Sequence, residues 1–121
     1  MAKINSRSKG KRGELAAVRF WAEHGWQGGR RGFQGRGGGE APDIIIPDLS
    51  DFLWFEVKHC QKLQPYKWME KAQRDCRAGH TPVVQMKSNN MDWMTLMWTV
   101  DFAGLLRAET LSNPSGAAED K

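Results

Sequence analysis

The chain has 121 residues, a length typical of one domain that can bury its own core. Its hydrophobic content of 40% excludes the composition of a disordered protein, and the two cysteines, Cys60 and Cys76, fit no CxxC spacing. We therefore expect neither a zinc scaffold nor a disulfide framework. No apolar stretch is long enough to span a membrane, and the amino terminus lacks the apolar core of a signal peptide, so a soluble, cytoplasmic protein is expected.

Basic side chains are concentrated at the front of the chain. Residues 1–36 hold nine Lys and Arg against two acidic residues, a net charge of +7, whereas the remainder carries −3. Such a segment is typical of proteins that bind nucleic acid, because each Lys or Arg at a phosphate releases condensed counterions. A solvated basic tail is an equal alternative for Lys3 to Lys11 alone, but Arg30, Arg31 and Arg36 in a Gly-rich stretch favour nucleic acid. Membrane binding is disfavoured, since no helix pairs this charge with an apolar face.

The sequence predicts an α–β–β–β–α–β–β order for a folded domain at 9–107. Helix stops are predicted at Gly25 and Gly79, which suit a left-handed cap, and Pro65 suits the first position of a helix. In order, we expect a flexible basic arm (1–8), a helix (9–24), an irregular strand (26–33), a Gly-rich loop (35–42), strands at 44–46 and 52–58, a helix (65–78), strands at 81–86 and 93–100, a short helix (101–106) and a disordered tail (108–121).

Two of these elements carry informative faces. Glu14 falls on the apolar face that the first helix builds from Leu15, Val18, Trp21 and Ala22. A carboxylate there must be paired, protonated, metal-bound or at the rim, because burying it alone is costly. The helix 65–78 is an ordinary amphipathic helix, with a basic outer face opposite an apolar one. The basic face holds Lys67, Lys71 and Arg74, and the apolar face holds Tyr66, Met69, Ala72 and Cys76.

The residues that carry chemistry are Glu14, Asp43, Glu56 and Lys58. Because side chains alternate between the two faces of a β-strand, Glu56 and Lys58 lie on one face of their strand. If the strands 43–46 and 52–58 are antiparallel neighbours, Asp43 lies beside Glu56. Two carboxylates there form the oxygen-rich site that Mg²⁺ or Mn²⁺ prefers, and a nearby ammonium suits phosphodiester hydrolysis. The alternative interpretation makes Asp43 a loop residue and Glu56 with Lys58 a cross-strand ion pair.

Five motifs occur in this order along the chain: GKRGELAAVRFW, RRGFQGRGGGEAPDIII, FLWFEVK, YKWMEKAQRD and PVVQM. The match that they define covers roughly residues 8–106. This arrangement resembles the PD-(D/E)XK nuclease superfamily, and within it the small Holliday-junction resolvases of archaea and their phage-encoded relatives. The resemblance implies an α/β fold with a mixed central β-sheet flanked by helices, restriction-endonuclease-like, with an αβββαβ core. It also implies a homodimer with two active sites that cuts branched DNA with Mg²⁺, for which we expect Mn²⁺ to substitute.

By position, the resemblance assigns Glu14 to the family's helix acid, Asp43 and Glu56 to its metal carboxylates, and Lys58 to its lysine. We count Glu14 with Asp43 and Glu56 as metal ligands. The candidate DNA contacts are Lys9, Lys11, Arg12, Arg30, Arg31, Gln34 and Arg36, with loop solubility as the alternative for Gln34 and Arg36. Histidine spacing disfavours an HNH or zinc nuclease.

The expected function is therefore metal-dependent hydrolysis of phosphodiester bonds in branched DNA. One alternative is the same chemistry on flaps, nicked duplexes or single strands. Another is a non-catalytic DNA-binding module with the same fold. The hydrophobic segment from Trp93 to Trp98 is the expected dimer face.

Overall fold

The computed structural model describes residues 6–32 and 41–112, which contain three helices and five strands of a single α/β domain. The elements are α1 (Ser6–Glu23), β1 (Arg30–Arg31), β2 (Ile44–Ile45), β3 (Leu53–His59), α2 (Pro65–Asp75), β4 (Thr81–Lys87), β5 (Met94–Leu96) and α3 (Thr99–Ser112). This order confirms the predicted alternation of helices and strands. Within the described ranges, no helix is both long and apolar enough to cross a membrane.

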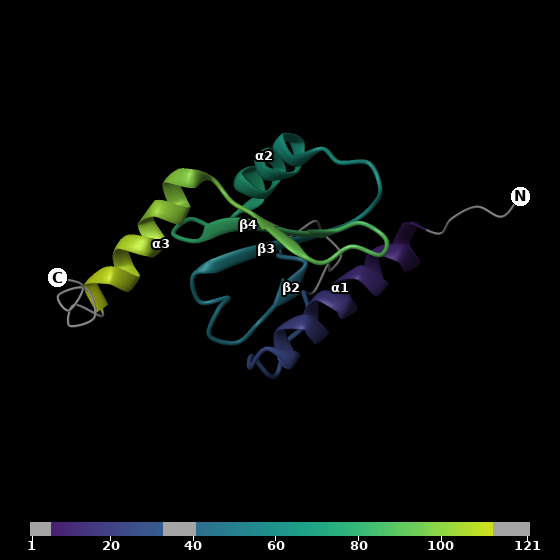
Figure 1. Cartoon of the computed structure of the whole chain (residues 1–121), viewed down its shortest axis with the longest axis horizontal. Coiled ribbons are helices and arrows are strands. Elements are labelled where there is room, and N and C mark those ends of the chain that lie inside the picture. The colour runs from purple at the N-terminus through teal and green to yellow at the C-terminus, as the bar shows by residue number, and fades with distance from the viewer. Residues whose placement is uncertain (1–5, 33–40, 113–121) are drawn as a thin grey trace, which may run out of the picture.

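The strands form one mixed sheet in the order β1-β2-β3-β4-β5. β3 and β4 are parallel, and the other neighbouring pairs are antiparallel. Parallel neighbours require a crossover connection, which α2 supplies between β3 and β4. α1 lies on one face of the sheet and α2 on the other (Figure 1). The mixed sheet flanked by helices thus agrees with the expected architecture.

Each face of the sheet has its own cluster of buried side chains. The cluster under α1 holds Ala17, Ile44, Ile46, Phe55 and Val83. The cluster under α2 holds Trp68, Met69, Ala72, Val84 and Met86. β3 alternates between them as predicted, with Phe55 facing α1 and its neighbours Trp54 and Glu56 on the opposite face. A fully buried side chain of this size contributes roughly 1.5–3 kcal/mol, so both helices are fixed firmly to the sheet.

Two predicted helix faces need correction. Leu15 is 44% exposed, and Ala17, which is fully buried, takes its place against the sheet. A small residue there lets α1 lie close to the strands. In α2, Tyr66 is 74% exposed whereas Trp68 is buried, so the apolar face is rotated towards Trp68. α2 also ends at Asp75 rather than 78, because Cys76 has an extended backbone with ψ of 137°.

The predicted glycine stop agrees with the structure at Gly25, just after α1, whereas Gly79 lies in the turn before β4 because α2 has already ended at Asp75. Gly25 and Gly79 have φ of 104° and 87°, in the left-handed region that favours glycine. The predicted turn at Asn89–Asn90 joins β4 to β5, and Asn90 has φ of 64°.

The carboxyl-terminal prediction was partly wrong. β5 covers only Met94–Leu96 of the expected strand 93–100, because a helix already begins at Thr99. The Trp98 carbonyl accepts hydrogen bonds from the backbone N–H groups of Asp101 (2.9 Å) and Phe102 (3.0 Å), which starts α3. α3 continues to Ser112, so 108–112 are helical rather than disordered, as are 6–8 at the start of α1. The rest of the expected arm and tail, 1–5 and 113–121, lies outside the described residues.

The expected dimer face, Trp93 to Trp98, is partly covered by the chain itself. Trp93 packs against the cluster under α1 and Trp98 against the cluster under α2. The Trp98 indole Nε1 donates a hydrogen bond to Gln73 Oε1 at 2.9 Å. Both rings are therefore half-buried against the chain's own core, and the dimer face on this segment stays a prediction.

Candidate active site

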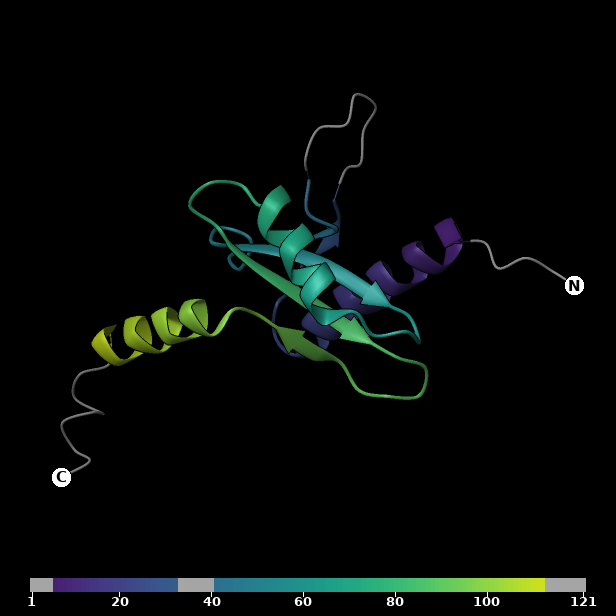
Figure 2. The same ribbon diagram turned by 90° about the horizontal axis from the view of Figure 1, so that it is seen from above.

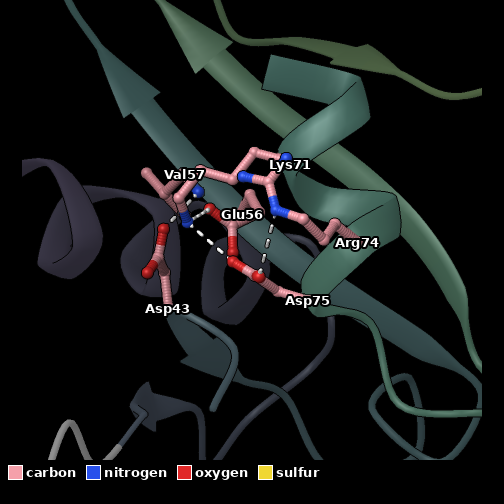
Figure 3. Close-up of polar contacts among 6 residues, drawn as sticks. All are labelled: Asp43, Glu56, Val57, Lys71, Arg74 and Asp75. Atoms are coloured by element: carbon pink, nitrogen blue, oxygen red, sulfur yellow. Dashed lines mark hydrogen bonds and ion pairs between the residues drawn. The ribbon is translucent and has the colours of Figure 1, made fainter. Parts of the chain in front are cut away.

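The antiparallel pairing of β2 with β3 brings Asp43 next to Glu56. The Asp43 backbone N–H donates to the Phe55 carbonyl, and the Val57 backbone N–H donates to Asp43 Oδ2, both at 2.8 Å. The carboxylate of Asp43 is thus fixed at the edge of β3, one residue from Glu56 (Figure 3). The predicted proximity of these two residues is confirmed.

A glycine that the sequence analysis left without a role sets this geometry. The Gly32 backbone N–H donates to the Asp43 carbonyl at 2.8 Å, just beyond β1. A Cβ at Gly32 would lie 1.8 Å from the Pro42 carbonyl oxygen, so no other residue fits without moving the backbone. The signal in the sequence was the glycine directly after Arg30–Arg31, but only the fold shows which strand it approaches.

Glu56 is the most buried charged group of the site. It is 4% exposed and lies on the face of β3 that α2 covers. Burial raises the pKa of Glu56, and the neighbouring Asp43 carboxylate raises it further, against the attraction of Lys71 and Lys58. Burial also raises the pKa of Asp43, as does the carboxylate of Glu14, while the Val57 hydrogen bond, Lys71 and Lys58 act in the opposite direction. Asp43 and Glu56 therefore disfavour each other's charge.

Lys71 belongs to this site, which the sequence analysis missed. Its Nζ lies 3.5 Å from Glu56 Oε1 and 2.9 Å from Asp75 Oδ2. Burial lowers the pKa of Lys71, but the hydrogen bond and charge of Asp75 and the charge of Glu56 outweigh it and raise the pKa. Figure 3 shows Lys71 and Asp75 coming from α2 and Glu56 from β3. Helical periodicity placed Lys71 on the outer face, and its long side chain reaches from there to the strand.

Glu14 is paired with a basic residue. Its Oε1 accepts from Arg31 Nε at 2.7 Å, and its side chain is largely buried. α1 comes this close to the end of β3 because Gly13 contacts His59, where a Cβ would lie 3.0 Å from the His59 Cβ. Of the four outcomes predicted for Glu14, the structure shows an ion pair. His59 thus faces α1, on the side of β3 opposite Lys58.

The other predicted DNA contacts are spread around α1 and β1. Lys11, Arg12 and Arg30 are exposed and Lys9 is half-buried. Gln34 and Arg36 lie outside the described residues. For Arg31, the ion pair with Glu14 is the interaction that the structure shows, and a contact with DNA stays a prediction.

The carboxylates of Asp43 and Glu56 fit a Mg²⁺ site in which the protein supplies only a few of the ligands. In the described part of the chain, no three Asp, Glu, His or Cys side chains are grouped closely enough to hold a metal ion. Glu14 forms an ion pair with Arg31 in this structure, and its role as a third ligand stays a prediction. Mg²⁺ commonly uses only one or two protein carboxylates and completes its shell with water and substrate phosphate. Asp43 and Glu56, adjacent and mutually repelling, suit that mode of binding.

No protein-family model matches the chain, and no curated protein matches it either. The resemblance to the PD-(D/E)XK nucleases therefore rests on the motifs in the sequence and stays a prediction.

Proposed function

We propose that the protein is a metal-dependent endonuclease of the PD-(D/E)XK type, with a restriction-endonuclease-like fold, that hydrolyses phosphodiester bonds in branched DNA. The observation that carries the proposal is the pair of desolvated carboxylates, Asp43 and Glu56, held together by backbone hydrogen bonds and flanked by Lys58 and Lys71. Two carboxylates are rarely placed side by side for structural reasons alone, because each raises the pKa of the other. Such perturbed groups concentrate at functional sites.

In this proposal Asp43 and Glu56 hold Mg²⁺, which supplies charge stabilisation to the scissile phosphate when bound. Lys58, on the same face of β3 as Glu56, places its ammonium where it orients the attacking water and stabilises charge on the phosphate. Lys71 offsets the charge of Glu56 in the metal-free protein. Glu14 and Arg31 fix α1 against β1 and so shape the wall beside Asp43.

The basic front of the chain is the proposed DNA surface. Lys11, Arg12 and Arg30 are exposed, and they belong to the two elements, α1 and β1, that also carry Glu14 and Arg31. A DNA strand whose phosphates bind along this surface reaches the carboxylates of Asp43 and Glu56.

We further propose that two copies form a homodimer through α3. This helix has no buried residue, and in both views it extends away from the sheet (Figures 1 and 2). Val100 is 76% and Leu111 67% exposed. An isolated helix of 14 residues is marginal in water, so α3 gains stability from a partner.

The sequence of α3 suits a second copy of itself. Helical spacing places Val100, Gly104, Ala108 and Leu111 on one face. Two antiparallel helices that cross at Gly104 put Val100 opposite Ala108 of the partner subunit. A Cβ at Gly104 would meet nothing within 4 Å, so this point is open to close approach.

The test uses a labelled four-way junction and a linear duplex of matched sequence, each incubated with Mg²⁺, Mn²⁺ or EDTA. We expect paired, metal-dependent nicks confined to the junction. Glu56→Ala should abolish cutting while DNA binding stays measurable, and Glu23→Ala, an exposed carboxylate at the end of α1, should cut as the wild type does.

Each other outcome has a defined meaning. Cutting of both substrates keeps the nuclease and overturns the preference for branched DNA. Salt-sensitive binding without any cutting favours the non-catalytic module. Undiminished cutting by Glu56→Ala contradicts the assignment of the site.

A further inference from the structure

A basic pocket lies between the end of β3 and the outer side of α2. Its cavity of about 340 Å³ is lined by four cationic side chains, Lys58, Lys67, Lys71 and Arg74, against one carboxylate, Glu70. Three of the four follow one another at i, i+4 and i+7 along α2, so they share a face of that helix. The pocket therefore concentrates positive charge from two elements that are separate in the sequence.

The pocket opens directly beside the proposed active site. It shares Lys58 and Lys71 with that site, and Lys71 Nζ lies 3.5 Å from Glu56 Oε1. A ligand bound in the pocket is thus separated from the Glu56 carboxylate by one side chain, that of Lys71.

The four cations divide into an inner and an outer pair. Lys58 and Lys71 act on the charges of Asp43 and Glu56, whereas Lys67 and Arg74 are not among the groups that influence either carboxylate. The outer pair is exposed, with Arg74 Nε 4.0 Å from Asp75 Oδ1. Across residues 6–32 and 41–112, Lys67 forms no ion pair. The outer half of the pocket is therefore positively charged and accessible.

We propose that this pocket binds a second phosphate of the cut DNA strand, next to the scissile one, with Lys67 and Arg74 as its positioning residues. The inference rests on the proposed function and adds to it a strand path along α2. A non-scissile phosphate held by Lys67 and Arg74 fixes the strand, while Lys58 and Lys71 face the phosphate that is cut. Positioning of this kind strengthens binding of substrate and transition state equally, so it affects KM rather than kcat.

The test compares Lys67→Ala/Arg74→Ala with Lys62→Ala/Arg77→Ala, which removes the same charge from exposed residues outside the pocket. On the junction with Mg²⁺, we expect the pocket variant to raise KM by roughly tenfold, the loss of one charge-assisted contact, with kcat unchanged. The control variant should show a much smaller rise in KM. All four residues are exposed, and thermal melting verifies that both variants fold.

A second readout does not depend on cutting. DNA binding is measured by fluorescence anisotropy in EDTA over a range of salt concentrations. The slope of log K against log salt should fall by about 1 in the pocket variant relative to the control variant, since one phosphate contact is lost. If the wild type binds but does not cut, and this difference persists, the pocket stands and the proposed catalysis fails. Equal slopes and equal affinities for the two variants, or a loss in kcat instead of KM, would overturn the proposal.

Discussion

Glu56 is a carboxylate held where its charge is disfavoured. It is nearly fully buried beside Asp43, and Lys71 compensates it only in part, so the pKa of Glu56 is raised. Sites arranged for function often carry such a cost in stability, because the residues that suit a ligand do not suit the empty fold. In this chain the cost is greatest when no cation is bound beside the two carboxylates.

Replacing the charge of Glu56 should therefore stabilise the metal-free protein. We expect Glu56→Gln to melt at a higher temperature than the wild type in EDTA, because the amide still accepts from Lys71 but no longer repels Asp43. Added Mg²⁺ should raise the melting temperature of the wild type and leave that of the variant unchanged, since ligand binding to the folded state stabilises it. Differential scanning calorimetry in EDTA and Mg²⁺ measures both effects. A lower melting temperature for Glu56→Gln in EDTA would contradict the argument.

The raised pKa values also fix the sign of a pH dependence. The carboxyls of Asp43 and Glu56 have higher pKa values folded than unfolded, so the folded state binds more protons. Their contribution to stability is present below the unfolded values of 3.8 and 4.5 and is lost as pH rises through the raised folded values. Urea unfolding of the metal-free protein should show that the free energy of unfolding declines as the pH rises through this range. The decline should be weaker in Asp43→Asn/Glu56→Gln. Equal pH profiles for the two proteins would count against it.

At the scale of elements, two glycines determine how closely α1 and β1 approach the site. Gly13 lets α1 contact His59 of β3, and Gly32 lets the chain after β1 contact Pro42. The first contact brings Glu14 near Asp43, and the second fixes the backbone of Asp43 itself. The position of the site thus depends on the lack of a side chain at Gly13 and Gly32.

Gly32→Ala should be destabilising, because its Cβ would lie 1.8 Å from the Pro42 carbonyl oxygen and the backbone has to shift. Overpacking of this kind costs about 1–3 kcal/mol, and displacement of Asp43 should also reduce cutting. Gly10→Ala is the matched control, since a Cβ there meets nothing within 4 Å. In the helix α1 it should stabilise the protein by about 0.5–1 kcal/mol. If urea unfolding shows that both substitutions change the free energy of unfolding in the same direction, this role for Gly32 is wrong.

Local sequence patterns were sufficient to predict the core of the fold. The apolar run at Ile44–Ile46 and the alternation at 52–58 predicted two neighbouring strands, and these place Asp43 beside Glu56. Lys71 was missed because periodicity assigns a helix face but not the reach of a long side chain. The length of α3 was missed because its exposed apolar residues, among them Val100, Phe102, Leu106 and Leu111, are spread around the helix and do not form the single stripe that packing against the sheet would require.

At the scale of the whole molecule, the proposed dimer helix is a different element from those that carry the proposed DNA contacts. The proposed DNA contacts and the basic pocket involve α1, β1 and α2, whereas exposed Val100, Phe102, Leu106 and Leu111 lie on α3. A dimer joined through α3 would leave the basic surfaces of both copies free. Two active sites in one particle are what paired nicks across a junction require.

Charges introduced on the apolar face of α3 test this arrangement. The chain has a mass of 13.7 kDa, and light scattering after size exclusion should give twice that value for the wild type. Val100→Lys or Leu111→Lys alone places a charge against the apolar face of the partner helix and should weaken the dimer, while the control Glu109→Lys, which lies off that face, should leave it intact. The weakened single variants should nick the junction on one strand at a time. A wild type that stays monomeric, or apolar-face variants that dimerise as well as the wild type, would show that α3 does not join the two copies.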